Sequence, residues 1–308
     1  MTTSRSATAT HAAAGALLVV AAAALFGTIG TARALGPDAP ALPVAAARSA
    51  LACLLLAAVP LWMAWRQGTG RELSVPAGVR VALRTRAVWT AALGQAAFQW
   101  CFLAAVPRVG VAVGTLVAIG LTPVVTGVLS RHVDRIWVLA TGIGLAGLVL
   151  LVGFGPVQDT AGLVLALGAS VMYAVYLVSG SGLARAHRQH GLGLDTALAV
   201  VFTIAAIVLM VPALATGPWA WLRTDSGAAM TVYLAVVPTL LAYHLLGTGL
   251  RSVTASTAST LGLTEPVVAT ALGILVLDER LSLVSALGAL LVLTAVLVLV
   301  RSSASPAP

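Results

Sequence analysis

The sequence predicts an all-α integral membrane protein with ten transmembrane helices, arranged as two inverted five-helix repeats. Composition is the first reason: 60% of the 308 residues are hydrophobic and 8% are charged, whereas soluble domains carry roughly 25% charged residues. Segment length is the second, because apolar stretches repeatedly reach the roughly 20 residues needed to cross a bilayer. The third is internal similarity, since Thr122-Pro123 and Glu265-Pro266 occupy matching positions in two apolar stretches.

Apolar runs between charged or Pro- and Gly-rich breaks place the helices along the chain. The first run is too long for a secretory signal, whose hydrophobic region spans about 7–15 residues, so we expect a retained helix. The predicted helices are 11–32, 40–64, 87–106, 109–130, 136–154, 160–183, 195–214, 228–250, 252–277 and 281–300. The predicted units are a tail at 1–10, a first repeat at 11–154, a second repeat at 160–301 and a tail at 302–308.

The basic residues indicate how the helices are oriented. All 17 are arginine. If the N-terminus is cytoplasmic, Arg33, Arg108, Arg223 and Arg280 fall on the outer side and Arg48 falls within a helix. The cytoplasmic side then carries Arg5, Arg66, Arg71, Arg80, Arg84, Arg86, Arg131, Arg135, Arg185, Arg188, Arg251 and Arg301. Because cytoplasmic loops hold the excess of positive charge, both termini are expected in the cytoplasm and the protein in a bacterial inner membrane.

The net charge of +8 does not indicate nucleic-acid binding. The arginines lie in short loops between apolar helices, as expected at an anionic membrane surface. Cys53 and Cys101 both fall within apolar helices and form neither a metal-ligand spacing nor a disulfide framework. We therefore expect no nucleic-acid partner, no metal and no cofactor.

The two halves of the chain also match away from the prolines. Asp134-Arg135 precedes Gly144 as Asp278-Glu279 precedes Gly288, and Leu25-Phe26-Gly27 resembles Met172-Tyr173-Ala174. Five helices per copy is an odd number, so the second copy must enter the membrane from the opposite side. This inverted-repeat plan is typical of secondary transporters, whose substrate site lies near mid-membrane between the repeats.

Two five-helix copies, the Thr-Pro and Glu-Pro helices, and the run Leu277-Asp278-Glu279-Arg280-Leu281 before a Gly-containing last helix resemble the drug/metabolite transporter superfamily, specifically its EamA branch. The resemblance covers about residues 11–301 and implies a secondary transporter. The halves differ in one respect: Thr122 stands where the second copy has Glu265, and Arg135 stands where it has Glu279. The two copies are therefore expected to play unequal chemical parts.

Glu265 is the first candidate functional residue, because an ionised carboxylate inside a membrane costs several kcal/mol. It lies in an otherwise uncharged stretch, 253–277. Its carboxylate is suited to bind a cationic or amine group of a substrate, or to carry a proton driven by a pH gradient. The alternative is a structural hydrogen bond between helices.

Arg48 and His244 are the next candidates. Arg48 lies about eight residues into the second predicted helix, and an arginine there needs a partner. Three uses are open: contact with a substrate carboxylate, an ion pair with Glu265, or a place at the membrane interface. Tyr243, which precedes His244, is also a candidate for substrate binding or coupling. His244 is suited to relay protons near neutral pH, although a lone histidine on such a helix is more often an interhelical hydrogen-bonding group.

The remaining candidates line the same predicted cavity or break helices. Gln95 and Gln99 lie on one face of the third helix with Trp100 nearby, where they suit a polar cavity wall or interhelical contacts. Thr122 is a candidate as the counterpart of Glu265. Pro123, Pro238 and Pro266 each remove a backbone donor, which is tolerated in a membrane where protein or a water-filled cavity satisfies the freed carbonyl; a simple kink is the alternative.

The sequence thus predicts a secondary transporter that exports small metabolites, amino acids or drug-like molecules by alternating access, with proton exchange at Glu265 as the coupling hypothesis. Its expected partners are a small-molecule substrate, protons and the lipid bilayer. One alternative is a passive facilitator, in which Glu265 only tunes selectivity. The other is an integral-membrane enzyme or scaffold, against which stand the lack of a second catalytic group and the short loops.

Overall fold

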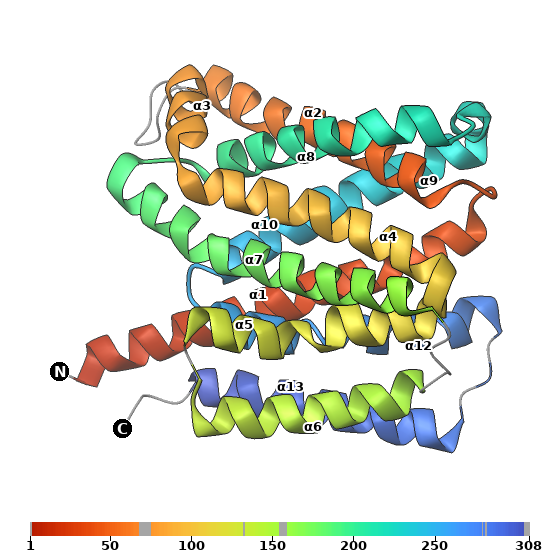
Figure 1. The fold of residues 1–308 in the computed structure, drawn as a ribbon. Coiled ribbons are helices and arrows are strands. Elements are labelled where there is room, and N and C mark those ends of the chain that lie inside the picture. Colours follow the sequence, from red (N-terminus) through yellow and green to blue (C-terminus); the bar gives the residue numbers. More distant parts are fainter. Residues whose placement is uncertain are drawn as a thin grey trace.

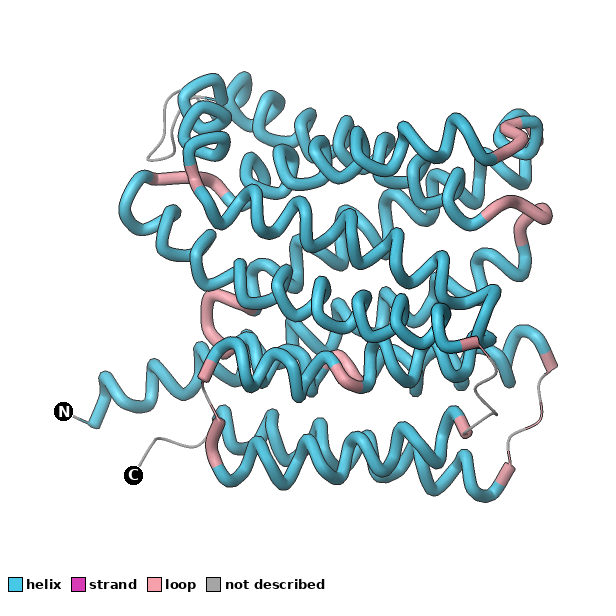
Figure 2. The backbone as a smooth tube through the Cα atoms, in the orientation of Figure 1, coloured by secondary structure: helices cyan, strands magenta, loops and turns pink. Residues whose placement is uncertain are grey.

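The computed structural model describes residues 2–67, 75–131, 133–153, 159–278, 280 and 282–304. Within these ranges the protein consists of helices joined by short loops, without a strand, and most helices run side by side along one direction (Figures 1 and 2). Arg71, Glu279 and Leu281, which the sequence analysis used, lie outside the described residues.

The helices follow the predicted order. They are α1 (Thr2–Leu35), α2 (Ala41–Gln67), α3 (Val75–Arg84), α4 (Arg86–Gly120), α5 (Thr122–Ser130), α6 (Arg135–Val152), α7 (Thr160–His190), α8 (Leu194–Thr216), the short 3-10 helix η1 (Ala220–Arg223), α9 (Asp225–Ala235), the π-helix η2 (Val236–Leu241), α10 (Ala242–Gly249), α11 (Ala255–Leu261), α12 (Thr264–Leu277) and α13 (Leu283–Ala304).

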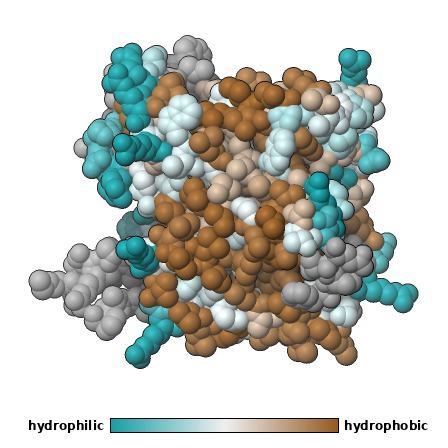
Figure 3. Space-filling view, viewed as in Figure 1, coloured by the Kyte–Doolittle hydropathy of each residue, from teal (hydrophilic) through white to brown (hydrophobic). Residues whose placement is uncertain are grey.

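This architecture confirms the predicted all-α membrane protein. In the described part of the chain, nine helical segments are long and apolar enough to cross a membrane. Large hydrophobic side chains are exposed along the bundle, and a broad apolar surface covers the face seen in Figure 3, as expected for helices in contact with lipid. The predicted helix at 87–106, the first part of α4, is not among the nine, so a total of ten stays a prediction.

The chain turns back on itself within α4. Gly110 has a non-helical backbone with φ 81° and ψ 160°, a region that glycine enters without steric cost. The chain reverses direction there, and the second part of α4 runs back towards α5 (Figure 1). The turn lies next to the predicted boundary between the helices at 87–106 and 109–130.

Two helices extend well beyond their predicted bounds, and one further helix was not predicted. α1 begins at Thr2 and α7 continues to His190, beyond the apolar cores that defined the predictions at 11 and 183. α3 was not predicted at all, because its ten residues, with Arg80 and Arg84, are too short and too polar to read as a span.

Two of the apolar segments contain a break. α4 ends at Gly120 and α5 starts at Thr122, while α11 ends at Leu261 and α12 starts at Thr264. The breaks fall immediately before Pro123 and Pro266, at matching positions in the two halves.

Helix packing treats the two halves alike. α2 packs along α8, and α6 packs along α13. α1 contacts α10 and α12, while α7 makes the corresponding contacts with α4 and α5. Helices at corresponding positions in the two predicted repeats therefore make corresponding contacts.

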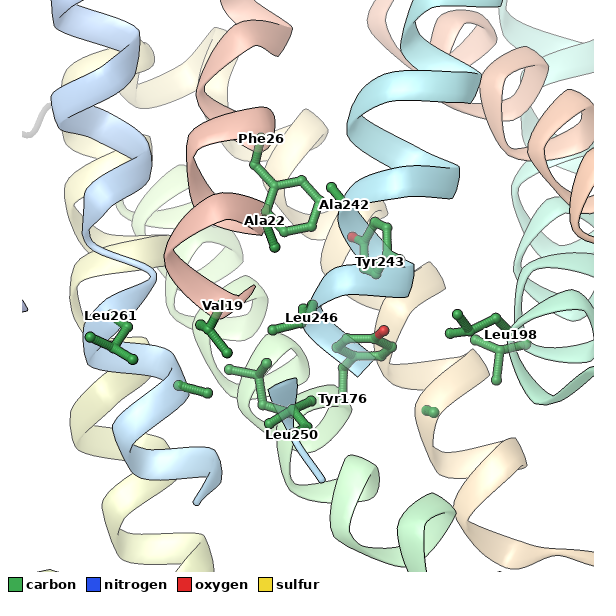
Figure 4. Close-up of a cluster of buried hydrophobic side chains, with 14 of the residues drawn as sticks. Val19, Ala22, Phe26, Tyr176, Leu198, Ala242, Tyr243, Leu246, Leu250 and Leu261 are labelled. Atoms are coloured by element: carbon green, nitrogen blue, oxygen red, sulfur yellow. The ribbon is translucent and has the colours of Figure 1, made fainter. Parts of the chain in front are cut away.

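The main hydrophobic core lies where α1, α7, α8, α10 and α11 meet (Figure 4). Phe26, Tyr176, Leu198, Tyr243 and Leu261 are all buried there, with less than a tenth of each side chain exposed. Tyr243 also reaches the polar residues described next, so the core fixes one wall of the candidate site.

Candidate functional site

Five polar side chains from four helices meet inside the bundle, and we call them the central polar cluster. They are Arg48 of α2, Gln95 and Gln99 of α4, Tyr243 of α10 and Glu265 of α12. All five were candidates from the sequence, although they are spread over more than 200 residues of the chain.

Two hydrogen bonds hold one side of the cluster together. Arg48 donates from Nη2 to Oε1 of Gln99 at 2.9 Å, and Gln95 donates from Nε2 to the Tyr243 hydroxyl at 2.6 Å. Gln95 and Gln99 can act together because residues four apart lie on one face of a helix. α4 therefore connects α2 to α10 through its two glutamines.

Glu265 faces the cluster without a direct partner. It is half-buried, and its carboxylate accepts no hydrogen bond from any residue that the structure describes. Arg48 lies within electrostatic range of it, yet no ion pair of 4.0 Å or less joins the two. Its oxygens are therefore available to a ligand or a proton. Either would stabilise the carboxylate, because an unpaired charge within a membrane is costly.

Glu265 is held in place through its backbone rather than its side chain. Its N–H donates to the carbonyl of Gly262 at 3.0 Å, which satisfies the acceptor that Pro266 leaves free. On its other side α1 approaches closely: a Cβ atom added to Gly27 would lie 2.7 Å from the Glu265 carbonyl oxygen. A glycine is therefore required at this contact.

One amide atom of each glutamine also has no hydrogen-bond partner among the described residues. Oε1 of Gln95 and Nε2 of Gln99 are buried without a hydrogen bond, in side chains that are 1% and 2% exposed. A buried polar group left unpaired costs about 1–3 kcal/mol. One acceptor and one donor are thus free beside Arg48 and Tyr243, and a bound polar molecule would satisfy both.

Aromatic side chains enclose the cluster. The Tyr243 ring makes edge contacts with Phe26, Phe202 and Tyr176, at centroid distances of 4.9, 4.7 and 5.6 Å. Figure 4 shows Phe26 and Tyr176 on either side of Tyr243. Tyr173, within electrostatic range of Glu265, stacks on Phe98 at 4.8 Å. These contacts restrict Tyr243 and limit the space open to water.

His244 is not part of the cluster. Its Nδ1 lies 2.7 Å from Oδ1 of Asp195, at the start of α8. The next residue on a helix is rotated by about 100°, so Tyr243 faces the core while His244 faces α8. The structure therefore places His244 in an interhelical pair and brings it to no residue of the central polar cluster.

Trp100 and Thr122 also lie outside the cluster. Trp100 is 44% exposed, since it follows Gln99 and so turns away from the face that carries the glutamines. Thr122 is buried, and its hydroxyl donates to the Ala118 carbonyl at 2.7 Å, with Ser170 Oγ 3.5 Å away. Among the described residues, neither side chain forms a hydrogen bond with a member of the central polar cluster.

Pro238 alters a third helix. It lies in the π-helix η2, and it has no N–H to donate to the carbonyl of Leu234. The Thr239 hydroxyl donates to that carbonyl instead, at 2.7 Å. The Thr239 hydroxyl thus takes the place of the donor that Pro238 lacks, four residues before Tyr243.

Asp195, the partner of His244, was not predicted from the sequence. An aspartate in the first turn of a helix is usually explained by the helix dipole, and no spacing rule connects positions 195 and 244. No cluster of three or more His, Cys, Asp or Glu side chains suited to a metal occurs among the described residues.

A bundle of apolar helices that encloses opposite charges and unpartnered polar atoms is the architecture of a membrane transport protein. Comparison with known proteins agrees. The chain belongs to the EamA-like transporter family, whose model matches residues 160–301. This confirms the family resemblance drawn from the sequence.

Two relatives and one solved structure illustrate the similarity. The chain is 35% identical to the uncharacterized transporter YwfM of Bacillus subtilis (strain 168), over 94% of each chain. It is 30% identical to the threonine/homoserine exporter RhtA of Escherichia coli (strain K12), over 89% of this chain and 88% of that one. A crystal structure with 20% identity superimposes with a TM-score of 0.76, covering 92% of this chain and 95% of the other, and so shares its fold.

Proposed function

We propose that this membrane transporter exports a small zwitterion, with an amino acid as the best-fitting class. One observation carries the proposal: Arg48 and Glu265 bring opposite charges to the same cluster, yet they do not form a direct ion pair with each other. A guanidinium binds a carboxylate through two parallel hydrogen bonds, and a carboxylate binds an ammonium group. The free acceptor of Gln95 and the free donor of Gln99 would add hydrogen bonds to the same zwitterion.

One relative supports both the substrate class and the direction of transport. RhtA carries the name threonine/homoserine exporter, and both of those compounds are amino acids with an ammonium group, a carboxylate and a hydroxyl group. The polar groups of the central polar cluster are sufficient in kind to bind all three.

We propose that transport proceeds by alternating access between two inverted repeats, 11–154 and 160–301, with ten crossings in total. The symmetric helix contacts support this arrangement, as does a family model matching 160–301. Arg48, Gln95 and Gln99 belong to the first repeat, whereas Tyr243 and Glu265 belong to the second. Movement of one repeat against the other would therefore open and close the site itself.

Glu265 is the proposed coupling residue. Its carboxylate lacks a hydrogen bond and lies in range of one cation, so the arrival of a proton and the arrival of an ammonium group compete for the same oxygens. Such competition makes export of the substrate depend on entry of a proton, as in an exchanger.

We place the protein in a bacterial inner membrane with both termini in the cytoplasm. The first residues of α1 and the last of α13 lie at the same end of the bundle (Figure 1). Most loop arginines belong to that end by the sequence count, which is the side where positive charge is retained.

The proposal is tested by mass spectrometry of intracellular and extracellular amino acids in an exporter-deficient bacterial host. The host expresses wild type, Glu265→Gln or Asp278→Asn at equal membrane abundance. Asp278 is an exposed residue at the end of α12, so its substitution matches the change in charge outside the site. We expect one or a few amino acids to accumulate outside with wild type and Asp278→Asn only.

Profiles identical to those of the empty vector would contradict amino-acid export. If amino acids accumulate outside equally with Glu265→Gln and with wild type, the proposed substrate class stands. The proposed coupling role of Glu265 is then contradicted, and passive facilitation is favoured.

A further inference from the structure

A basic surface at one end of the bundle plays no part in the central polar cluster. We define the basic platform as five exposed arginines from α3, the start of α4 and the last turns of α7: Arg80, Arg84, Arg86, Arg185 and Arg188. None of the five forms a hydrogen bond or ion pair with another described residue. Hydrophilic side chains gather over the corner where α3 and the end of α7 lie (Figure 3).

α3 presents two of these arginines on an amphipathic helix. Gly78 and Ala82 are buried, and Gly78 lies against Thr196 at the start of α8. Arg80 and Arg84 are exposed and share one face, because they are four residues apart. A short helix that is apolar on one side and arginine-rich on the other is typical of the membrane interface.

The end of α7 joins this surface through close contacts with α4. The hydroxyl oxygens of Thr90 and Ser179 are 2.8 Å apart, and a Cβ atom added to Gly182 would lie 2.6 Å from that of Ala87. Arg185 follows Gly182 by less than one helical turn. The platform therefore bridges the two halves of the protein.

An apolar edge borders the arginines. Leu83 and Trp89 are 46% and 43% exposed, and the Trp89 indole N–H donates to the Leu83 carbonyl at 2.8 Å. Tryptophan is enriched at the level of lipid headgroups, where one end of the ring is apolar and the other polar. The arginines thus lie at headgroup depth with a lipid-facing surface beside them.

We propose that the basic platform binds the phosphate groups of an anionic phospholipid, with the acyl chains resting on Leu83 and Trp89. Arginine matches phosphate geometry through paired N–H donors, and basic clusters next to transmembrane helices recognise anionic headgroups. A lipid with two phosphates, such as cardiolipin, offers one phosphate to the arginines of α3 and the start of α4 and the other to those of α7. One lipid would then contact both α3 and α7. The inference does not depend on which substrate is transported.

Native mass spectrometry of the detergent-solubilised protein, titrated with cardiolipin, tests this proposal. The variants are Arg84→Gln/Arg86→Gln, Arg84→Lys/Arg86→Lys, and the control Arg223→Gln/Arg280→Gln, which removes two exposed arginines before α9 and after α12, at the opposite end. Each basic residue near an anionic surface contributes about fivefold to binding. We expect cardiolipin binding to weaken roughly 10- to 25-fold in the glutamine variant, about threefold in the lysine variant, and not in the control.

Equal retention of cardiolipin by all four proteins would overturn the proposal, as would an equal loss in the control and the glutamine variant. Gel filtration and circular dichroism establish that each variant is folded. If the glutamine variant fails to fold, the lysine variant decides, because it keeps the charges that orient the helices; binding equal to wild type would then overturn the proposal.

Discussion

The breaks before Pro123 and before Pro266 occupy equivalent places in the two halves and have different chemistry. At the first break, Thr122 is buried and its hydroxyl donates to the Ala118 carbonyl in the last turn of α4, across the break. At the second, Glu265 is half-buried, and its carboxylate lies in range of Arg48 but accepts no hydrogen bond from another described residue. The two breaks thus share a Pro-containing sequence pattern, and the second carries an ionisable side chain where the first carries a hydroxyl.

The largest expected effect is at the second break. In proteoliposomes with an imposed pH gradient, Glu265→Gln should lower gradient-driven amino-acid transport by at least about 100-fold, because an amide cannot exchange a proton. Asp278→Asn is the matched control and should retain the wild-type rate. Substantial gradient-driven transport by Glu265→Gln would contradict proton exchange at Glu265 as the difference between the two breaks.

Arg48→Gln tests the opposite charge. Hydrogen bonds to charged groups contribute about 1.5–3 kcal/mol, so the Kd for an exported amino acid should rise roughly 10- to 100-fold. The methyl ester of the same amino acid, which lacks the carboxylate, should bind wild type and Arg48→Gln alike. Arg223→Gln serves as the control. An unchanged Kd for the free acid would assign Arg48 to structure alone.

The close approach of α1 to the second break can be tested on α1. Gly27→Ala would place a Cβ atom 2.7 Å from the Glu265 carbonyl oxygen, and such overpacking costs about 1–3 kcal/mol. Gly30→Ala, nearly one turn further on, meets nothing within 4 Å and should be neutral or slightly stabilising. Thermal unfolding of both variants measures the difference; equal melting temperatures would contradict the tight contact.

The smallest expected effect is at the first break. Thr122→Val removes the bond to the Ala118 carbonyl, and losing one such bond costs about 1 kcal/mol of stability. Transport should stay within about twofold of wild type. Loss of gradient-driven transport in a folded Thr122→Val protein would mean that both breaks take part in the chemistry.

Much of the fold could be predicted because the membrane imposes a simple rule: long apolar segments must be helices. α3 was not predicted, because it is neither long nor apolar enough to cross a membrane. The position of the turn at Gly110 was predicted only approximately. Five of the candidate site residues converge as the central polar cluster, because a polar group within a long apolar segment is a strong signal. Trp100 and His244 do not join it, since sequence spacing alone left open which neighbour on a helix faces inwards.

On α10, the π-helix η2 determines that Tyr243, and not the neighbouring His244, faces the central polar cluster. Each extra residue in a helical turn rotates everything after it by about 100° relative to a regular α-helix. Pro238, with the Thr239 hydroxyl in place of the missing donor, creates that extra residue five positions before Tyr243. A regular helix over the same residues would turn the tyrosine away from Gln95 and carry another side chain into its place. The position of Tyr243 in the central polar cluster is therefore set partly by a proline that lies outside the cluster.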